Sequence, residues 1–145
     1  MIYSVTTEIK AEPDTVWGVM SDIERWPEWT PGVTSVRRHE PGPLAVGNQT
    51  TIRQPRLPPA RWTVTELENG RSFTWISRSP GILVTARHRV DPAGRGSQAT
   101  LSISFDGLLG VAFGWLTRVI TQRYLSLEAA GLKACSEERR FAAGR

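Results

Sequence analysis

The chain has 145 residues, of which 39% are hydrophobic and 22% are charged, and its formal net charge is +4. This length and composition predict one domain over residues 1–145 and exclude collagen-like, coiled-coil and disordered chains. A single cysteine, Cys135, excludes an intramolecular disulfide framework and a cysteine-rich zinc module, and two histidines cannot form a three-histidine metal site. We therefore expect no metal and no cofactor.

The distribution of positive charge and the length of the apolar stretches limit the kinds of partner that the chain can bind. Most of the 18 lysines and arginines are arginines, scattered without a basic run or a nucleic-acid-binding motif, which favours a solvated basic surface over a nucleic-acid interface. The longest apolar stretch, 108–116, has about half the length of a bilayer span. Residues 1–10 show no secretory signal pattern. We expect no nucleic acid, no membrane span and a cytoplasmic location.

The N-terminal third of the chain predicts a strand followed by two short helices. Residues 2–9 alternate and are rich in β-branched side chains, which indicates a half-buried strand. Pro13, followed by an acid, marks the start of the first helix. The second covers 21–26, because a residue before proline avoids helical geometry and Pro27 follows.

The middle of the chain predicts an antiparallel meander. Short β-rich segments alternate with turn dipeptides of proline, glycine, asparagine and aspartate at a spacing of roughly ten residues, which does not suit alternating β-α-β units. The six strands are expected over 33–38, 48–54, 61–67, 72–78, 82–90 and 99–105, with a turn over 91–94.

The last third predicts one long helix over 108–138. Apolar residues recur there at three- and four-residue steps, and no proline interrupts them. At about 45 Å this helix would cross the full width of the sheet. Gly110, Gly114 and Gly131 lie inside it, each at a cost of up to about 1 kcal/mol against alanine. Either close backbone packing or space for a ligand explains these glycines.

A curved sheet around one helix leaves interior volume, and the sequence offers a lining for it. His88 follows Val84 at period two, so it faces inward, and Arg123 shares a helical stripe with Phe113. The candidate ligand-binding residues are Trp62, Phe73, Trp75, Val84, His88, Ile103, Phe105, Phe113, Leu116, Ile120 and Arg123. Structural roles compete: His88 as a hydrogen-bonded core residue, and Arg123 with its stem buried and its head in water.

An ordered set of packing and turn residues runs along nearly the whole chain. It consists of Ile9-x-Ala11-x-Pro13-x-x-Val16-Trp17, Ser21-Asp22-x-x-x-Trp26-Pro27-x-Trp29, Gly47, Trp62-x-Val64-Thr65-Glu66, Gly70-Arg71-x-Phe73 and Leu132-Lys133. This set resembles the START-like, Bet v 1-like helix-grip superfamily, in particular its bacterial polyketide cyclase/dehydrase branch. The resemblance implies an α+β fold: a curved seven-stranded antiparallel sheet around a long C-terminal helix, two short helices after the first strand, and a cavity.

The resemblance implies a cavity but no named catalytic residue. Members bind lipids, sterols, polyketides, plant hormones or quinones, and some cyclise or dehydrate polyketides, so the fold does not fix the function. The leading hypothesis is binding of a hydrophobic or aromatic small molecule, lipid- or polyketide-like, oriented by His88 and Arg123. Whether the chain is an enzyme, and its catalytic residues, stay open.

Two alternatives remain at this stage. The first is a polyketide cyclase or aromatase acting on a carrier-bound or free polyketide, with His88 as acid or base, Arg123 stabilising an oxyanion, and Tyr3 or Tyr124 relaying a proton. An acidic acyl carrier protein would then suit the positive net charge. The second is a non-catalytic carrier or interaction domain. Monomer and homodimer both stay open.

Overall fold

The computed structural model describes residues 1–143. Its strands are β1 (Ile2–Ile9), β2 (Ser35–Arg38), β3 (Gln49–Arg53), β4 (Ala60–Glu68), β5 (Ser72–Ser79), β6 (Ile82–Ala93) and β7 (Gly96–Asp106). Its helices are α1 (Pro13–Ser21), the 3-10 helix η1 (Ile23–Glu28), α2 (Gly110–Leu116) and α3 (Arg118–Ala143). This element order confirms the predicted α+β helix-grip fold.

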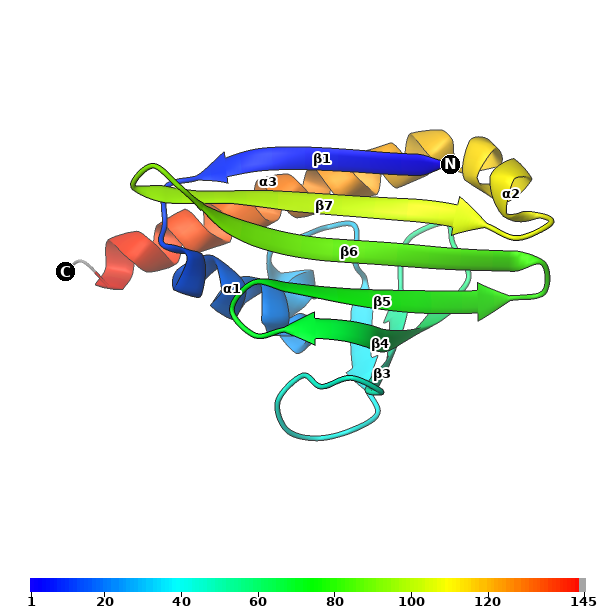
Figure 1. Ribbon diagram of the computed structural model, residues 1–145, viewed down its shortest axis with the longest axis horizontal. Helices are drawn as coiled ribbons and strands as arrows, with labels where there is room; N and C mark the ends of the chain where they lie inside the picture. The colour runs from blue at the N-terminus through cyan, green and yellow to red at the C-terminus, as the bar shows by residue number, and fades with distance from the viewer. Residues whose placement is uncertain (144–145) are drawn as a thin grey trace.

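The strands form one antiparallel sheet in the order β1-β7-β6-β5-β4-β3-β2, so β1 and β2 are its edges. Figure 1 shows α3 running behind β1 and β7, with α1 beside its C-terminal half, while β3 lies across the direction of β5 and β6. The sheet is therefore strongly curved around the helices. No helix among residues 1–143 combines the length and the apolar character needed to cross a bilayer.

The hairpin of β6 and β7 is longer than predicted, and the predicted turn over 91–94 is wrong. The two strands pair as far as Ala93 and Gly96, and Gly94 adopts a φ of 57° in the turn between them. Pro92 is tolerated inside β6 because β5 pairs with β6 only as far as Arg89, which leaves Pro92 a strand neighbour on one side. The other predicted strands agree with the observed ones to within two residues.

The prediction of one helix over 108–138 is wrong at one point, because the chain bends at Thr117. Thr117 has φ −97° and ψ 7°, and both its backbone N–H and its Oγ1 hydroxyl donate to the carbonyl of Phe113. A threonine hydroxyl that bonds four residues back competes with regular helical geometry. The result is a separate short helix, α2, followed by α3.

The predicted second helix over 21–26 is also corrected, since η1 contains Pro27 and continues to Glu28. The N–H groups of Trp29 and Thr30 then both bond to the carbonyl of Trp26. A 3-10 helix tolerates this proline in a short piece where a longer α-helix would break. The indole of Trp26 is buried as a consequence, and its Nε1 donates to the carbonyl of Met20.

The interior has a filled half and a hollow half. In the filled half, α1, η1 and the C-terminal part of α3 pack against the sheet around these buried side chains: Ile9, Val16, Val19, Met20, Ile23, Val90, Ala99 and Leu132. At the other half, the N-terminal part of α3 faces the strands across a cavity. The curvature of the sheet and the bend at Thr117 together set the width of this cavity.

Candidate functional site

A cavity of about 560 Å³ lies between the concave face of the sheet and the segment from α2 to the middle of α3. Its wall alternates along the strands, as period-two geometry requires: Val84, Ala86 and His88 come from β6, and Ile103 and Phe105 from β7. Most of the exposed lining is hydrocarbon and indole surface. This volume and composition are those of small-molecule sites.

Two stacked indoles form one wall of the cavity. Trp62 on β4 and Trp75 on β5 lie with their ring centroids 5.4 Å apart and their planes 28° from parallel. Both rings are nearly buried, and both line the cavity. A flat aromatic ligand would therefore meet a rigid π surface that stacking and edge contacts can use.

Among the polar residues that line the cavity, His88 and Glu128 form a direct contact between sheet and helix. His88 Nε2 lies 3.2 Å from Glu128 Oε1, and their side chains are 5% and 18% exposed. Glu128 reaches the imidazole from α3, so the contact crosses the cavity from helix to sheet. The other imidazole nitrogen, Nδ1, is buried and has no hydrogen-bond partner among the described residues.

Aromatic rings hold the imidazole of His88 in place. Phe73, its direct neighbour across the β5–β6 ladder, stacks on it at 4.3 Å and 6°, and Trp75 meets it edge-on at 5.7 Å. Trp26 from η1 closes the third side at 5.4 Å. With its plane fixed in this way, His88 has little freedom to turn, and it presents Nε2 to Glu128.

The structure brings seven of the predicted site residues into the cavity wall and places four elsewhere. The seven are Trp62, Trp75, Val84, His88, Ile103, Phe105 and Phe113. Phe73 is fully buried behind the imidazole rather than at the cavity surface. Leu116 is 72% exposed, Arg123 is exposed, and Ile120 is half-buried outside the wall.

The predicted inner positions of Leu116, Ile120 and Arg123 are corrected for one physical reason. They continued from Phe113 at steps of three, four and three, whereas the inner face continues from Phe113 through Thr117 at steps of four. The inner face of α3 carries Thr121, Leu125 and Glu128 instead. Glu128 was not predicted, although the spacing of these three residues at steps of four and three is a helical face that would have revealed it.

The two tyrosines lie in different places. Tyr124 lines the cavity near its rim, where its hydroxyl donates to the carbonyl of Pro55. Tyr3 lies outside the cavity wall, and its hydroxyl donates to the carbonyl of Gly114. Of the two residues suggested as proton relays, only Tyr124 therefore borders the cavity.

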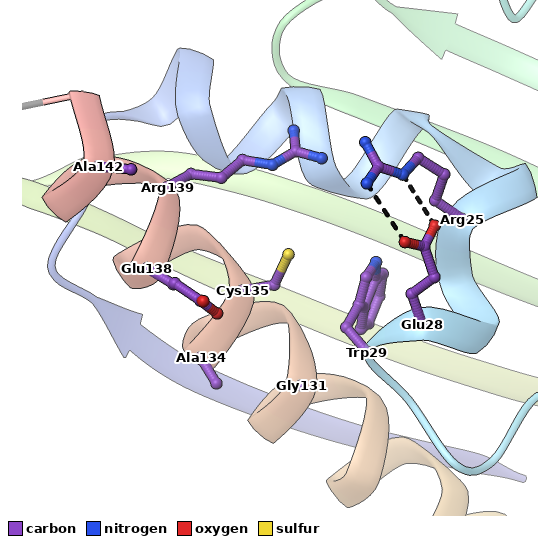
Figure 2. Close-up of a pocket in the computed structure, with 9 residues that line it drawn as sticks. All are labelled: Arg25, Glu28, Trp29, Gly131, Ala134, Cys135, Glu138, Arg139 and Ala142. Atoms are coloured by element: carbon purple, nitrogen blue, oxygen red, sulfur yellow. Dashed lines mark hydrogen bonds and ion pairs between the residues drawn. The ribbon is translucent and has the colours of Figure 1, made fainter.

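A second hollow of about 570 Å³ lies on the outside of the helices, between η1 and the C-terminal half of α3 (Figure 2). Two of its charged residues are paired with each other: Arg25 and Glu28 form a two-point ion pair at 2.8 and 3.2 Å, and hydrogen bonds from Arg25 hold the pKa of Glu28 below its ordinary value. Both side chains are more than half exposed. We place the candidate site in the interior cavity, whose wall is mostly apolar and carries the contact between His88 and Glu128.

Metal binding has no geometric basis in the described part of the chain. Within residues 1–143, no group of three or more histidine, cysteine, aspartate or glutamate side chains converges on a common point. The cavity therefore offers mostly apolar contact, the contact between His88 and Glu128, and further polar lining that includes Ser77, Thr121 and Tyr124.

Comparison with solved structures shows the fold of the START/Bet v 1-like superfamily. The Zhui aromatase/cyclase from Streptomyces is 17% identical, with a TM-score of 0.80 over 99% of this chain and 98% of that chain. Major latex-like protein 151 from Panax ginseng is 16% identical, with a TM-score of 0.76 over 92% and 95%. A START superfamily protein from Mycobacterium smegmatis is 16% identical, with a TM-score of 0.75 over 94% and 97%.

Sequence comparison gives the family. A search of curated protein sequences finds no match. Residues 2–136 match the family described as "Polyketide cyclase / dehydrase and lipid transport", which is nearly the whole chain. The match agrees with the helix-grip fold and with the cavity between sheet and helix. The chain therefore belongs to the polyketide cyclase/dehydrase and lipid transport family.

Proposed function

We propose that the chain binds a hydrophobic or aromatic small molecule in the interior cavity. The observation that carries this proposal is the hollow of about 560 Å³, walled mostly by apolar and indole surface and crossed by the contact between His88 and Glu128. Burial of apolar ligand surface contributes about 25 cal/mol per Å², less the cost of immobilising the ligand. The family description, which includes lipid transport, supports the same class of ligand.

The polar pair selects among such ligands. The Nε2–H of His88 meets Oε1 of Glu128, so the second carboxylate oxygen of Glu128 is left to accept a hydrogen bond from the cavity side. A buried carboxylate that accepts only one bond is costly, and a hydroxyl donor would reduce this cost. We therefore expect the ligand to carry a phenol or enol hydroxyl at the end that meets Glu128.

The test is a titration with 1,8-dihydroxyanthraquinone, a flat phenol that suits both the indole wall and the carboxylate. Binding should quench the fluorescence of Trp62 and Trp75, because both indoles border the cavity. Val84→Phe fills the cavity from β6 and should weaken binding by about tenfold or more. Thr85→Phe is the matched control, since the adjacent residue points to the opposite face of the sheet and should leave binding unchanged. Equal binding by both variants would overturn the proposal.

A polyketide cyclase or aromatase is the second candidate, favoured by the His88–Glu128 pair. Glu128 is the base in this proposal: it removes a proton from a methylene between two carbonyls of a polyketide. The resulting carbanion carbon attacks a ketone carbonyl of the same chain, a carbon–carbon bond forms as the carbonyl π bond opens, and the alkoxide oxygen takes up the proton that Glu128 removed. His88 holds the carboxylate in position. An acyl carrier protein is the proposed donor of a carrier-bound substrate, and the net charge of +4 suits its acidity.

Cyclisation of a poly-β-keto N-acetylcysteamine thioester separates an enzyme from a binder. If Glu128 is the base, Glu128→Gln should lower the rate by about a hundredfold or more while 1,8-dihydroxyanthraquinone still binds. Arg123→Gln is the control, because this side chain is exposed and should leave the rate unchanged. A rate equal to the spontaneous reaction without protein would rule out the cyclase assignment and leave the binding function intact.

A further inference from the structure

Large hydrophobic side chains are exposed together at one end of the molecule. Leu108 is 97% exposed, Leu116 is 72% exposed and Val119 is 70% exposed, and all three lie within one segment of twelve residues. We call this region the α2 surface and define it by Leu108, Leu109, Val111, Trp115, Leu116 and Val119. Elsewhere among the described residues, few large hydrophobic side chains are exposed. The exposed Met1 and Ile2 lie at the same end of the molecule, because the backbone of Met1 pairs with that of Phe105 beside α2. A concentration of exposed apolar side chains of this kind marks an interaction surface.

The fold holds these side chains outward. α2 packs through its glycines, because a Cβ at Gly114 would lie 2.9 Å from the Phe105 ring and one at Gly110 would lie 3.3 Å from the Phe105 backbone. The bulky residues of the helix therefore occupy the face that points away from the sheet. The hydroxyl of Tyr3 anchors this arrangement by donating to the carbonyl of Gly114. Figure 1 shows α2 projecting at the end of the sheet, next to the N-terminus.

Cationic side chains accompany the α2 surface. The guanidinium of Arg118 lies 4.3 Å from the ring centroid of Trp115 and donates to the Trp115 carbonyl. Arg123 follows Val119 by four residues on α3, so both exposed side chains share one face of the helix. Asp106 is an acid at the same end, so the charge there is mixed with an excess of arginine.

The exposed apolar side chains and the adjacent arginines together indicate what binds the α2 surface. A projecting helix with aliphatic tips, a tryptophan and adjacent arginines matches a segment that lies at the boundary between lipid headgroups and acyl chains. The arginines complement anionic headgroups, and the net charge of +4 has the same sign. We propose that the α2 surface docks on an anionic lipid bilayer.

Docking would place the cavity beside the bilayer. Phe113 in α2 and Thr117 after it line the cavity, while Leu116 between them is exposed on the α2 surface. An apolar ligand could then pass between lipid and cavity with little exposure to water. This route for the ligand rests on the proposed binding function, whereas docking itself rests on the α2 surface alone.

Vesicle sedimentation tests the docking. The wild-type chain, without added ligand, is mixed with vesicles of equimolar phosphatidylcholine and phosphatidylglycerol and with vesicles of phosphatidylcholine alone. We expect binding to the anionic vesicles that weakens at high salt, because the arginines contribute to it. Leu116→Glu combined with Val119→Glu should weaken this binding by at least about tenfold, since two inserted aliphatic side chains become acids. Both residues are exposed, so the substitutions should not affect folding.

Val46→Glu is the matched control, since Val46 is 61% exposed and lies between β2 and β3, away from α2. It should bind vesicles as the wild type does. Docking is overturned if the wild type stays in the supernatant with both vesicle types, or if the double variant sediments as well as the wild type. Light scattering measures the mass in solution and tests whether a second copy of the chain binds the α2 surface instead. A wild type that is a dimer and binds no vesicles, together with a double variant that is a monomer, would assign the α2 surface to a second copy. Because none of these measurements uses a ligand, they are independent of the anthraquinone titration.

Discussion

Glu128 contributes the carboxylate that meets His88, and this contact joins α3 to the sheet across the cavity. The strands provided most of the correct site predictions, because a period of two fixes which side of the sheet each residue faces. His88 and Val84 were placed inward on that basis, and both line the cavity. Glu128 escaped prediction because its face of α3 includes the polar residue Thr121, which weakens the apolar periodicity on which the prediction depended.

Glu128→Ala tests the stabilising effect of the pair. Removing the carboxylate leaves a second nitrogen of the buried His88 ring without a partner, so we expect the free energy of unfolding to fall by about 1–3 kcal/mol. Urea denaturation measures this difference. Arg123→Ala should change the value by less than about 0.5 kcal/mol, because the side chain is exposed. A larger loss for Arg123→Ala than for Glu128→Ala would contradict the assignment of the inner face.

Two helical glycines give opposite predictions for the same substitution. A Cβ at Gly131 would lie 2.0 Å from the Trp29 carbonyl oxygen, whereas one at Gly18 meets only Arg139 Nη1 at 3.8 Å. Gly131→Ala should therefore lower the free energy of unfolding by about 1–3 kcal/mol despite its better helix propensity. Gly18→Ala should raise it by up to about 1 kcal/mol. If thermal unfolding shows that both variants are stabilised, close packing does not explain Gly131.

At the scale of elements, the sequence predicted the type of nearly every segment and missed where the helices change direction. Period and turn residues identify strands and helices because they reflect local geometry. The bend at Thr117 has a local part, the bond from the Thr117 hydroxyl to the Phe113 carbonyl, and a tertiary part, the packing of α2 against Phe105 through Gly110 and Gly114. A tertiary contact of this kind has no local signature, so the end of α2 could not be placed from the sequence.

Glu137 joins α3 to the end of β1 and makes this contact sensitive to pH. Its carboxylate accepts hydrogen bonds from Lys133 Nζ at 2.7 Å and from the backbone N–H of Lys10 at 2.8 Å, and these bonds lower its pKa below the ordinary 4.5. A lowered folded-state pKa means that the stabilisation is present above the unfolded-state pKa and is lost as the pH falls through the folded-state value.

Glu137→Gln should therefore reduce the free energy of unfolding at neutral pH by about 0.5–1 kcal/mol, a discounted figure for a side chain that is 29% exposed. The difference from the wild type should shrink below the folded-state pKa, where the native carboxyl is also neutral. Denaturation across this pH range gives the measurement, with the exposed Glu138→Gln as control. A difference that stays constant with pH would show that the charge of Glu137 does not stabilise the contact.

At the scale of the whole molecule, the account depends on how the interior is divided. The helices α1 and η1 fill one half with packed side chains, and the curved strands keep α3 away from the sheet in the other half. The fold and the existence of a hollow followed from element order and from the family resemblance. The depth of the hollow depends on the curvature of the sheet and the bend at Thr117, which no single segment encodes.

The central claim is that this hollow receives the ligand, and methyl NMR tests it most directly. Chain with labelled isoleucine, leucine and valine methyls is titrated with 1,8-dihydroxyanthraquinone. We expect shift changes and intermolecular NOEs at Val84, Ile103 and Leu125, which line the cavity, and none at Val16 or Leu132 in the filled half. Ligand contacts confined to exposed methyls such as those of Leu116, or no contacts at all at saturating ligand, would contradict the account.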